Sequence, residues 1–391
     1  MKYETLMLYT GADVEGDTMF PDSPAIYHAT AYRVKDTRDY DKKNAGEGFF
    51  YSRSRNPNRE LLGEAISFLE KGEKTIITSS GMAAVSTPLI ALLKQGDHVV
   101  ASNAIYGETI EVFDILLGKF GVEATYVDFS DIEAVKAAIR PNTKMLYSEV
   151  ISNPLISLVD IREISKISKD AGALLVIDNT FSTPYVTNPL TMGADIVVHS
   201  LTKFINGHSD VTGGSITASA EIIDSIMHTY YMLGGCLDAN SSWLALRSIR
   251  TFGLRMQKAV SNAQKLAEAL EKDPRVRQVN YPGLKSSPYY ELGKEMFPNG
   301  AGPMISFLME DDRDKVDDFI HRLKMVQYLG TLGGFRTSFA HPATGFRTEF
   351  TPEQLVEMGM TEGLIRISVG IEEPEDIIND IIGALDAFGT L

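Results

Sequence analysis

Short apolar runs alternate with helix-like runs through the middle of this chain, and this alternation constrains the fold more than any other feature. The apolar, strand-like runs lie at 74–80, 97–103, 122–129, 143–150, 173–180, 194–200 and 214–219. Continuous apolar strands separated by helices are typical of a mostly parallel sheet with both faces covered. The predicted fold class is therefore α/β, built around one large and mostly parallel sheet.

The pattern changes on both sides of this region. The first 55 or so residues contain few periodic segments and many turn formers, whereas a long amphipathic stretch at 240–273 leads into shorter runs. We predict an N-terminal arm at 1–55, a large domain at 56–245, and a smaller C-terminal α+β domain at 246–391 joined by a long helix. Gly72 is the predicted C-cap of the helix that opens the large domain.

Composition limits the class of partner and compartment. The 37 basic and 52 acidic residues give a net charge of −15, which argues against a nucleic-acid-binding surface. The single cysteine, Cys236, excludes an internal disulfide and suits a reducing compartment. No apolar stretch has the length of a signal-peptide core or a membrane span. We therefore expect a cytoplasmic protein without a membrane partner, and no metal site, because the histidines are scattered.

Chemically distinctive residues follow several of the predicted strands. In open parallel sheets, ligands collect outside the carboxyl ends of the strands. Gly81 and Met82 follow one strand and open a helix, so their backbone N–H groups could face an anion. Asp178 ends another strand and needs a cationic partner, because an unpaired carboxylate there would be costly to desolvate. Tyr106 lies in a loop after a third strand.

The stretch HSLTKFINGHSDVTGG, at 199–214, places Lys203 beside two hydroxyls, Ser200 and Thr202, at the end of an apolar strand. Taken alone, Lys203 is an ordinary solvated loop lysine and SSGMAA an ordinary small-residue turn. Pyridoxal 5′-phosphate (PLP) explains all these residues together. Its phosphate needs an anion cradle and hydroxyl donors, its ring nitrogen an acid, its ring face an aromatic, and its aldehyde a lysine. A nucleotide site is disfavoured, because neither GxxxxGK[ST] nor GxGxxG follows a strand.

Motifs along the chain resemble one family of PLP enzymes. They are YSRSRNP, SSGMAA, IYGET, ISNP, DNTFSTP, HSLTKFINGHSDVTGG, AHPAT and IRISVGIE, in this order. The sequence resembles the Cys/Met-metabolism family, the group of cystathionine γ-synthase, methionine γ-lyase and O-acylhomoserine sulfhydrylase. The resemblance implies a fold-type I, aminotransferase-like architecture. It also implies an active site built by two subunits, and a homotetramer assembled from such dimers.

The resemblance also implies roles for residues at matching positions. Lys203 would form the Schiff base and act as a base, and Tyr106 would stack on the ring and protonate the leaving group. Asp178 would pair with the ring nitrogen. The phosphate would be held by Ser80, Gly81, Met82, Ser200 and Thr202, and by Tyr51 and Arg53 of the neighbouring subunit. Asn153 would contact the ring hydroxyl side and the substrate, Arg366 the substrate α-carboxylate through a bidentate fork, and Thr331 and Glu108 the rest of the substrate.

The predicted reaction is γ-elimination from a methionine- or homocysteine-like amino acid, with 2-oxobutanoate, ammonia and a thiol as products. A γ-replacement transferase, such as an O-acyl-L-homoserine sulfhydrylase, uses the same cofactor residues and is the runner-up. A PLP-fold protein without activity, working as a regulatory module, is a third alternative. The joint presence of Lys203, Asp178 and Arg366 argues against it.

Departures from the family pattern bear on the substrate. Cystathionine enzymes resemble YGGTxR at the tyrosine loop and carry a glutamate before SLGG, whereas this chain has Glu108, Glu111 and Gly330 at those places. These changes argue against a cystathionine lyase or synthase. The usual MTH after HPA is replaced by Gly345-Phe346-Arg347. Glu108 is either a solvated loop acid or a partner for a cationic distal group, as in canavanine.

Overall fold

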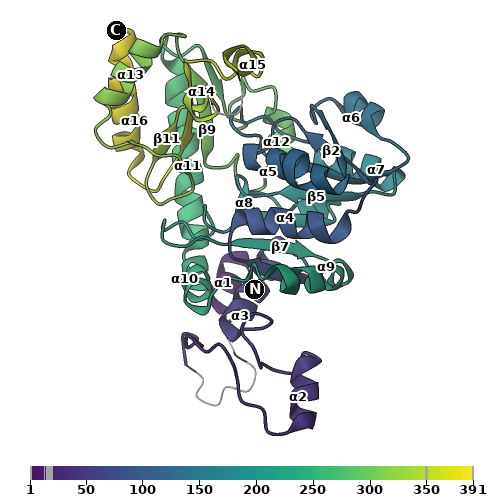
Figure 1. Cartoon of the computed structure of the whole chain (residues 1–391). Helices are drawn as coiled ribbons and strands as arrows, with labels where there is room; N and C mark the ends of the chain where they lie inside the picture. The colour runs from purple at the N-terminus through teal and green to yellow at the C-terminus, as the bar shows by residue number, and fades with distance from the viewer. Residues whose placement is uncertain (1, 13, 15–20, 348–350, 390–391) are drawn as a thin grey trace.

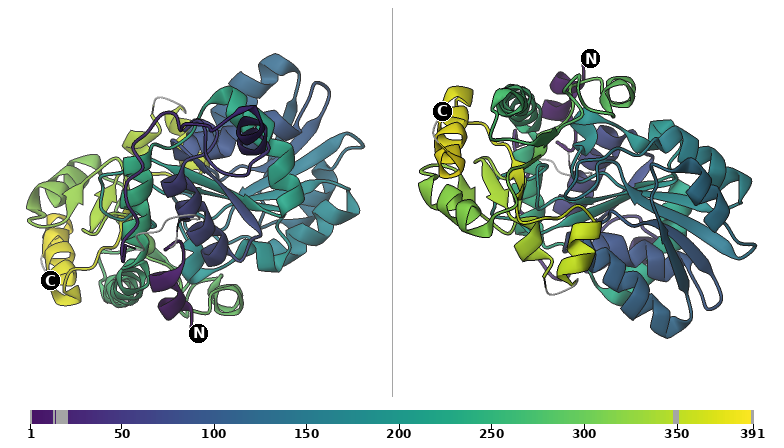
Figure 2. Two further views of the ribbon diagram at one scale, coloured as in Figure 1. Left: turned by 90° about the horizontal axis from the view of Figure 1, so that it is seen from below. Right: turned by 90° about the horizontal axis from the view of Figure 1, so that it is seen from above.

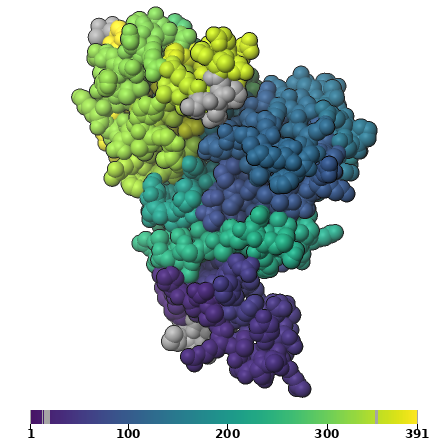
Figure 3. All heavy atoms as spheres, viewed as in Figure 1, coloured from purple at the N-terminus to yellow at the C-terminus, as the bar shows by residue number. Residues whose placement is uncertain are grey.

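The computed structural model describes residues 2–12, 14, 21–347 and 351–389. Figure 1 shows a central body around a large sheet, a C-terminal part beside it, and an N-terminal segment with helix α2 (Thr37–Asn44) that projects below the body. The projecting segment forms the narrow lower end of the space-filling view (Figure 3). Within the described ranges, no helix combines the length and the apolar character that crossing a membrane requires.

The central body is built on a seven-stranded sheet, which confirms the predicted α/β class. The strands follow the order β1-β7-β6-β5-β4-β2-β3. Their bounds are Lys74–Thr78 (β1), His98–Ser102 (β2), Glu123–Val127 (β3), Thr143–Glu149 (β4), Leu174–Asp178 (β5), Ile196–Ser200 (β6) and Gly214–Ala218 (β7). β7 runs antiparallel to both of its neighbours, and the other pairs are parallel. The carboxyl ends of β1, β4, β5 and β6 therefore share one edge of the sheet.

Helices cover both faces of this sheet. Buried residues of α3 (Pro57–Glu70) and α7 (Ile161–Asp170) join one apolar cluster with strand residues such as Ile177 and Val197. Those of α4 (Gly81–Leu92) and α9 (Ala220–Leu233) join a second cluster with Val176 and Val198. Successive side chains of β5 and β6 point to opposite faces of the sheet, and this alternation produces the two clusters. The position of a residue along one of these strands therefore decides which face of the sheet its side chain points to.

The start of α3 follows sequence signals, but its end differs from the prediction. Asn56 caps the helix by accepting from the N–H of Asn58, and Pro57 occupies the first turn. The left-handed residue after the helix is Lys71, with φ of 58°, and not the predicted Gly72. Gly72 has a different role, because a Cβ atom there would lie 2.3 Å from Thr217 Cγ2. The glycine permits close packing against β7.

The predicted long helix at 240–273 is two helices, α10 (Ala239–Ile249) and α11 (Phe252–Lys272). Two hydroxyl groups bond backbone carbonyls near the break: Ser248 Oγ donates to Leu244 O at 3.0 Å, and Thr251 Oγ1 donates to Ser248 O at 3.3 Å. Such bonds compete with the helical pattern and favour a break. The predicted boundary at 245/246 falls inside α10, and the predicted domain limits remain a prediction.

The C-terminal part contains a five-stranded sheet in the order β10-β11-β12-β9-β8. Its strands are Gln278–Asn280 (β8), Met304–Leu308 (β9), Gln327–Tyr328 (β10), Ser338–Ala340 (β11) and Leu364–Ser368 (β12). Figure 2 shows this part, green to yellow, to one side of the large sheet with its helices on the outside. The other α-helices are α1 (Tyr3–Tyr9), α5 (Gly107–Glu111), α6 (Ile132–Ala138), α8 (Thr183–Val186), α12 (Tyr290–Met296), α13 (Arg313–Arg322), α14 (Pro342–Gly345), α15 (Pro352–Glu357) and α16 (Pro374–Ala384).

Candidate active site

The first turn of α4 lies directly against the carboxyl end of β6. Gly81 opens α4, and a Cβ atom added to it would lie 2.8 Å from Ser200 Oγ. Gly214, on β7, pairs with both Thr78 and Ser200, and a Cβ there would lie 2.3 Å from Ser80 O. Two glycines are thus needed for this close approach. It brings helix N–H groups without intrahelical acceptors to a serine hydroxyl, an arrangement suited to an anion.

The other predicted phosphate residues surround this point with their hydroxyls partly engaged. Ser80 Oγ accepts from the N–H of Ala83 at 3.0 Å as the N-cap of α4, so its own proton is still available to a ligand. Thr202 Oγ1 accepts from Gly213 N at 3.0 Å and donates to Gly213 O at 3.3 Å. Met82 is half-buried and packs beside the apolar cluster under α4. Their roles toward a phosphate remain a prediction.

Two acids face each other at the ends of β4 and β5, where Glu149 pairs in register with Asp178. Burial raises the pKa of Asp178, while hydrogen bonds from Thr180 and the charge of His199 lower it. Burial, and then the charge of Asp178, raise the pKa of Glu149 well above its usual range. A cationic N–H group beside Asp178 would favour its charged form. Asp178 therefore suits the ring nitrogen of PLP.

Thr180 connects this acid to the phosphate side, a connection that the sequence analysis missed. Its N–H donates to Asp178 Oδ1 at 2.8 Å, and its Oγ1 accepts from the N–H of Ser200 at 2.9 Å. The motif DNTFSTP marked the segment but gave no reason to single out this threonine. The two bonds fix the ends of β5 and β6 relative to each other.

Lys203 lies in a helical turn after β6 and reaches across to the C-terminal part of the chain. Its Nζ donates to Thr331 Oγ1 at 2.8 Å. Burial and the charge of Arg366 lower the pKa of Lys203, and the charge of Glu108 raises it. Arg255, on α11, donates to the carbonyl oxygens of Phe204 and Ile205 at 2.8 and 2.9 Å. These bonds hold the turn in place. A lowered pKa makes the amine more readily available as a nucleophile and base.

Arg366, on β12, and Asn153, after β4, meet between the two sheets. Arg366 Nη1 donates to Asn153 Oδ1 at 2.7 Å, and the guanidinium lies 5.8 Å from the centre of the Phe181 ring. Burial lowers the pKa of Arg366 to about 10, and the charges of Glu149 and Tyr106 oppose this shift. The arginine is close enough to affect Lys203, as expected for a group that binds the carboxylate of an amino acid near that lysine.

Tyr106 and Glu108 flank the start of α5. The N–H of Tyr106 donates to Glu149 Oε1 at 2.8 Å, and the tyrosine is 42% exposed. Glu108 is exposed, yet its charge acts on Lys203. Glu149 thus positions the tyrosine loop beside Asp178.

Tyr51 and Arg53 lie elsewhere, in the N-terminal segment. Arg53 Nη1 donates to Tyr231 O at 2.7 Å near the end of α9, and its guanidinium lies 5.7 Å from the centre of the Tyr51 ring. Both residues are exposed. In the described chain their printed contacts are with each other and with α9, and their role toward a cofactor remains a prediction.

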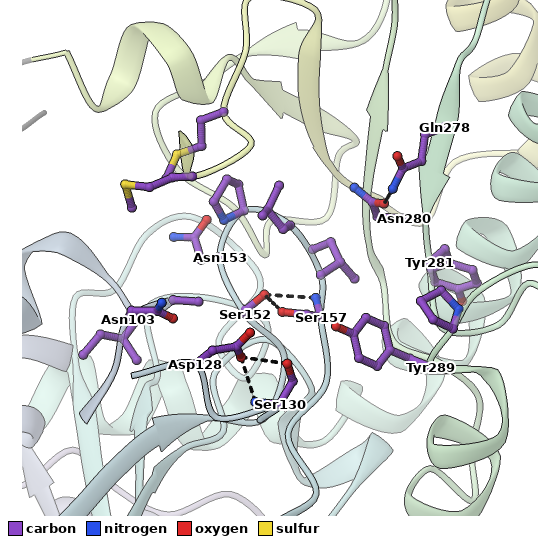
Figure 4. A pocket seen from close by; sticks show the side chains of 18 of the residues that line it. Asn103, Asp128, Ser130, Ser152, Asn153, Ser157, Gln278, Asn280, Tyr281 and Tyr289 are labelled. Carbon is purple, nitrogen blue, oxygen red and sulfur yellow. Dashed lines mark hydrogen bonds between the residues drawn. The ribbon is translucent and has the colours of Figure 1, made fainter. Parts of the chain in front are cut away.

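A cavity of about 1020 Å³ lies beside this site, between the ends of β2, β3 and β4 and the C-terminal part. Figure 4 shows its polar wall, in which the Ser152 and Ser157 hydroxyls are 2.5 Å apart. Of the predicted site residues, Asn153 alone lines the described cavity. It is therefore a neighbouring space that shares only Asn153 with the predicted site residues.

The residues of this site fit PLP. The first turn of α4 approaches Ser200 through Gly81, an acid with a pKa raised by burial ends β5, and an amine with a lowered pKa follows β6. The family model described as Cys/Met metabolism PLP-dependent enzyme matches residues 4–386. The chain belongs to this family. It is a PLP-dependent enzyme of the Cys/Met lyase group, as the resemblance implied.

Relatives of the family carry several activities. The chain is 42% identical over 387 residues to cystathionine gamma-lyase of Bacillus subtilis (strain 168), covering 99% of this chain and 100% of that protein. It is 39% identical over 342 residues to L-methionine gamma-lyase of Fusobacterium nucleatum subsp. polymorphum, covering 87% and 86%. A solved structure from Campylobacter jejuni, described as an O-acetylhomoserine (thiol)-lyase, matches with a TM-score of 0.93 at 30% identity, covering 99% and 100%. That structure carries N′-pyridoxyl-lysine-5′-monophosphate.

Proposed function

We propose that this enzyme catalyses γ-elimination on a methionine- or homocysteine-like amino acid. With methionine, one water is consumed, the Cγ–S bond and the Cα–N bond break, and 2-oxobutanoate, ammonia and methanethiol form. When bound, PLP supplies an electron sink for the negative charge that develops on the substrate carbons. The other tasks fall to side chains of this chain and its neighbour.

One observation carries the proposal, namely the arrangement of charge around Lys203. Arg366 is the cation that acts on the lysine, and Glu108 is the anion that acts on it. If Arg366 binds the α-carboxylate, the distal end of the substrate approaches a carboxylate instead of a second cation. Cystathionine carries a distal carboxylate, which Glu108 would repel. An uncharged thioether or thiol side chain is compatible with the same site.

Each side chain then has a definite task. Arg366, oriented by Asn153, holds the α-carboxylate. Lys203 Nζ accepts the α-proton, and Thr331 Oγ1, which accepts a hydrogen bond from the free amine, fixes its position. Tyr106, which is 42% exposed, gives a proton to the leaving sulfur. Asp178 accepts the N–H of the pyridine ring and thereby keeps that nitrogen protonated.

The direct test is a panel of substrates with the purified, PLP-loaded protein. Methionine, homocysteine and cystathionine are supplied alone, O-acetylhomoserine is supplied with and without sulfide, and 2-oxobutanoate, pyruvate and ammonia are measured. We expect kcat/KM for methionine or homocysteine to exceed that for cystathionine. Homocysteine formed from O-acetylhomoserine and sulfide, faster than any elimination, would instead assign the runner-up, γ-replacement. A higher kcat/KM for cystathionine would overturn the proposal.

Glu108 favours a second candidate, a γ-lyase for a substrate with a cationic distal group such as canavanine. Replacing Glu108 with glutamine removes the negative charge and keeps the shape. If the charge binds a cation, kcat/KM for canavanine should fall about five- to tenfold in Glu108→Gln, while that for methionine stays level. Glu64→Gln is the matched control, because Glu64 is an exposed acid on α3. An equal response of canavanine and methionine would exclude this candidate.

We further propose that the active site is shared between two subunits of a homotetramer. The N-terminal segment projects from the body (Figure 1), and Tyr51 and Arg53 on it are exposed. A phosphate held by the neighbour's tyrosine and arginine explains why these residues lie away from Lys203 in their own chain.

Mixed oligomers test this sharing. Arg53→Ala is expected to weaken PLP binding, and Lys203→Ala to abolish activity. In a dimer of one variant with the other, one of the two sites has both native residues. Random pairing of equal amounts should therefore restore about one quarter of the wild-type activity at limiting PLP. If both residues served the same chain, the mixture would be no more active than the separate variants.

A further inference from the structure

A buried acid and a buried histidine meet on the face of the large sheet opposite to Asp178. Glu70 is the last residue of α3 and is 0% exposed, and His199, on β6, is 1% exposed. His199 Nε2 contacts Glu70 Oε1, and Asn179 Nδ2 donates to the same oxygen at 2.8 Å. A buried charged group is expensive unless it is paired, so this cluster is costly to keep.

Strand register ties the pair to the cofactor residues. Asp178 pairs with Val198, and the N–H of Asn179 donates to Val198 O at 3.0 Å. His199 and Asn179 are thus the chain neighbours of Ser200 and Asp178. Because side chains alternate along a strand, His199 and Asn179 point toward α3, while Ser200 and Asp178 point to the opposite face.

Two atoms of the pair have no hydrogen-bond partner within the part of the chain that the structure describes, namely Glu70 Oε2 and His199 Nδ1. Unsatisfied buried polar atoms are costly, and apolar residues of similar size often replace a buried polar pair without loss of stability. Packing alone therefore does not account for the pair. Glu70 instead bonds both His199 and Asn179, the chain neighbours of Ser200 and Asp178.

We propose that Glu70 and His199 are positioning residues for the cofactor's ring-nitrogen partner. Glu70, held at the end of α3, contacts His199 and accepts a hydrogen bond from Asn179, and this cluster fixes the ends of β5 and β6 that carry Asp178 and Ser200. The proposal rests on the assignment of Asp178 within the proposed function. Other groups in this region are Tyr3 from α1, whose hydroxyl pKa is raised by burial and then by Glu70, and Tyr147 and Glu149 from β4. These groups stay unchanged in the variants below.

The test uses His199→Gln and Glu70→Gln in the full chain. The readouts are the dissociation constant of PLP and the pH midpoint of the absorbance change of the bound cofactor. We expect each variant to weaken PLP binding about tenfold, the loss expected when one buried hydrogen bond of the cluster is removed. The double variant should lose no more than either single variant, because the two residues act as one unit.

His98→Gln is the matched control. His98 is a fully buried histidine on β2 of the same sheet, bonded to Thr143 and Thr125 at 2.8 and 2.9 Å. This variant should lower thermal stability and leave PLP affinity unchanged. If His199→Gln and Glu70→Gln behave like His98→Gln, the pair is structural and the proposal is overturned. Should His199→Gln not fold, Glu70→Gln alone decides between these results.

Asp178→Asn separates this proposal from the site assignment. A large loss of PLP affinity in Asp178→Asn, without any loss in the Glu70 and His199 variants, would reject the positioning role alone. No loss in Asp178→Asn would reject the assignment of Asp178 itself.

Discussion

Lys203→Ala is expected to lower kcat/KM by about 10⁴-fold or more, the largest loss for any single side chain of this enzyme. The amine is the group that attaches PLP, and it is also the base placed to accept the α-proton. Burial and Arg366 lower its pKa, so a larger fraction of the amine is neutral at a given pH. No other amine is bonded to Thr331 in the described chain. Steady-state kinetics on the PLP-loaded variant measures the loss.

Two companion experiments locate the cause of that loss. Borohydride treatment followed by digestion should add the mass of reduced PLP to the peptide around Lys203 in the wild type, and leave it unchanged in Lys203→Ala. Thr331→Val removes the hydroxyl that accepts from Lys203 Nζ and should cost about tenfold in kcat, whereas Thr331→Ser should retain activity. If Lys203→Ala keeps more than about one hundredth of the activity, a different residue carries the chemistry.

Gly333→Ala should displace the loop that positions Thr331 against Lys203. Gly333 has φ of 81°, and a Cβ atom there would lie 2.6 Å from Phe204 N and 2.8 Å from Lys203 Cα. Its N–H donates to Ser368 Oγ at 2.8 Å, so the loop cannot move away without losing that bond. Because the clash is with backbone atoms, we expect about 3–5 kcal/mol lower stability and about 10²-fold lower kcat.

Gly172→Ala is the control for backbone strain. Gly172 follows α7 with φ of 63°, and an added Cβ would have no heavy atom within 4 Å. The variant should lose about 1–2 kcal/mol of stability, from the left-handed conformation, and keep its activity. Thermal unfolding and kcat are compared for both variants. If stability and kcat change equally in Gly333→Ala and Gly172→Ala, the close approach of Gly333 to Lys203 has no specific effect on activity.

The residues at strand ends were predictable because position along a strand is a local property. An apolar run that stops at Asp178, or at Ser200 and Lys203, shows where the sheet edge lies, and parallel connections put those edges together. The same reasoning failed at helix ends. The break between α10 and α11 depends on hydroxyl–carbonyl bonds at Ser248 and Thr251, which periodicity does not register.

Contacts between segments that are far apart in the chain could not be predicted from the sequence. Thr180 is linked to the site because its Oγ1 accepts from the backbone N–H of Ser200. Glu70 is linked to it through its contact with His199, 129 residues away. Arg366 and Asn153 were assigned from the family motifs, and the tertiary structure supplied the bond between them. No spacing in the sequence predicts these pairs, because the partners approach each other only after both sheets have formed.

The sequence by itself determined the α/β class, the sheet edge that bears the chemistry and the need for PLP, because strand period and residue type are encoded locally. Tertiary structure alone decided which groups touch. The Thr331 loop packs on Lys203, Glu149 positions Tyr106, and an acid and a histidine are buried beneath Asp178. These contacts depend on packing between chain segments that are far apart in sequence, and packing is a property of the whole folded chain.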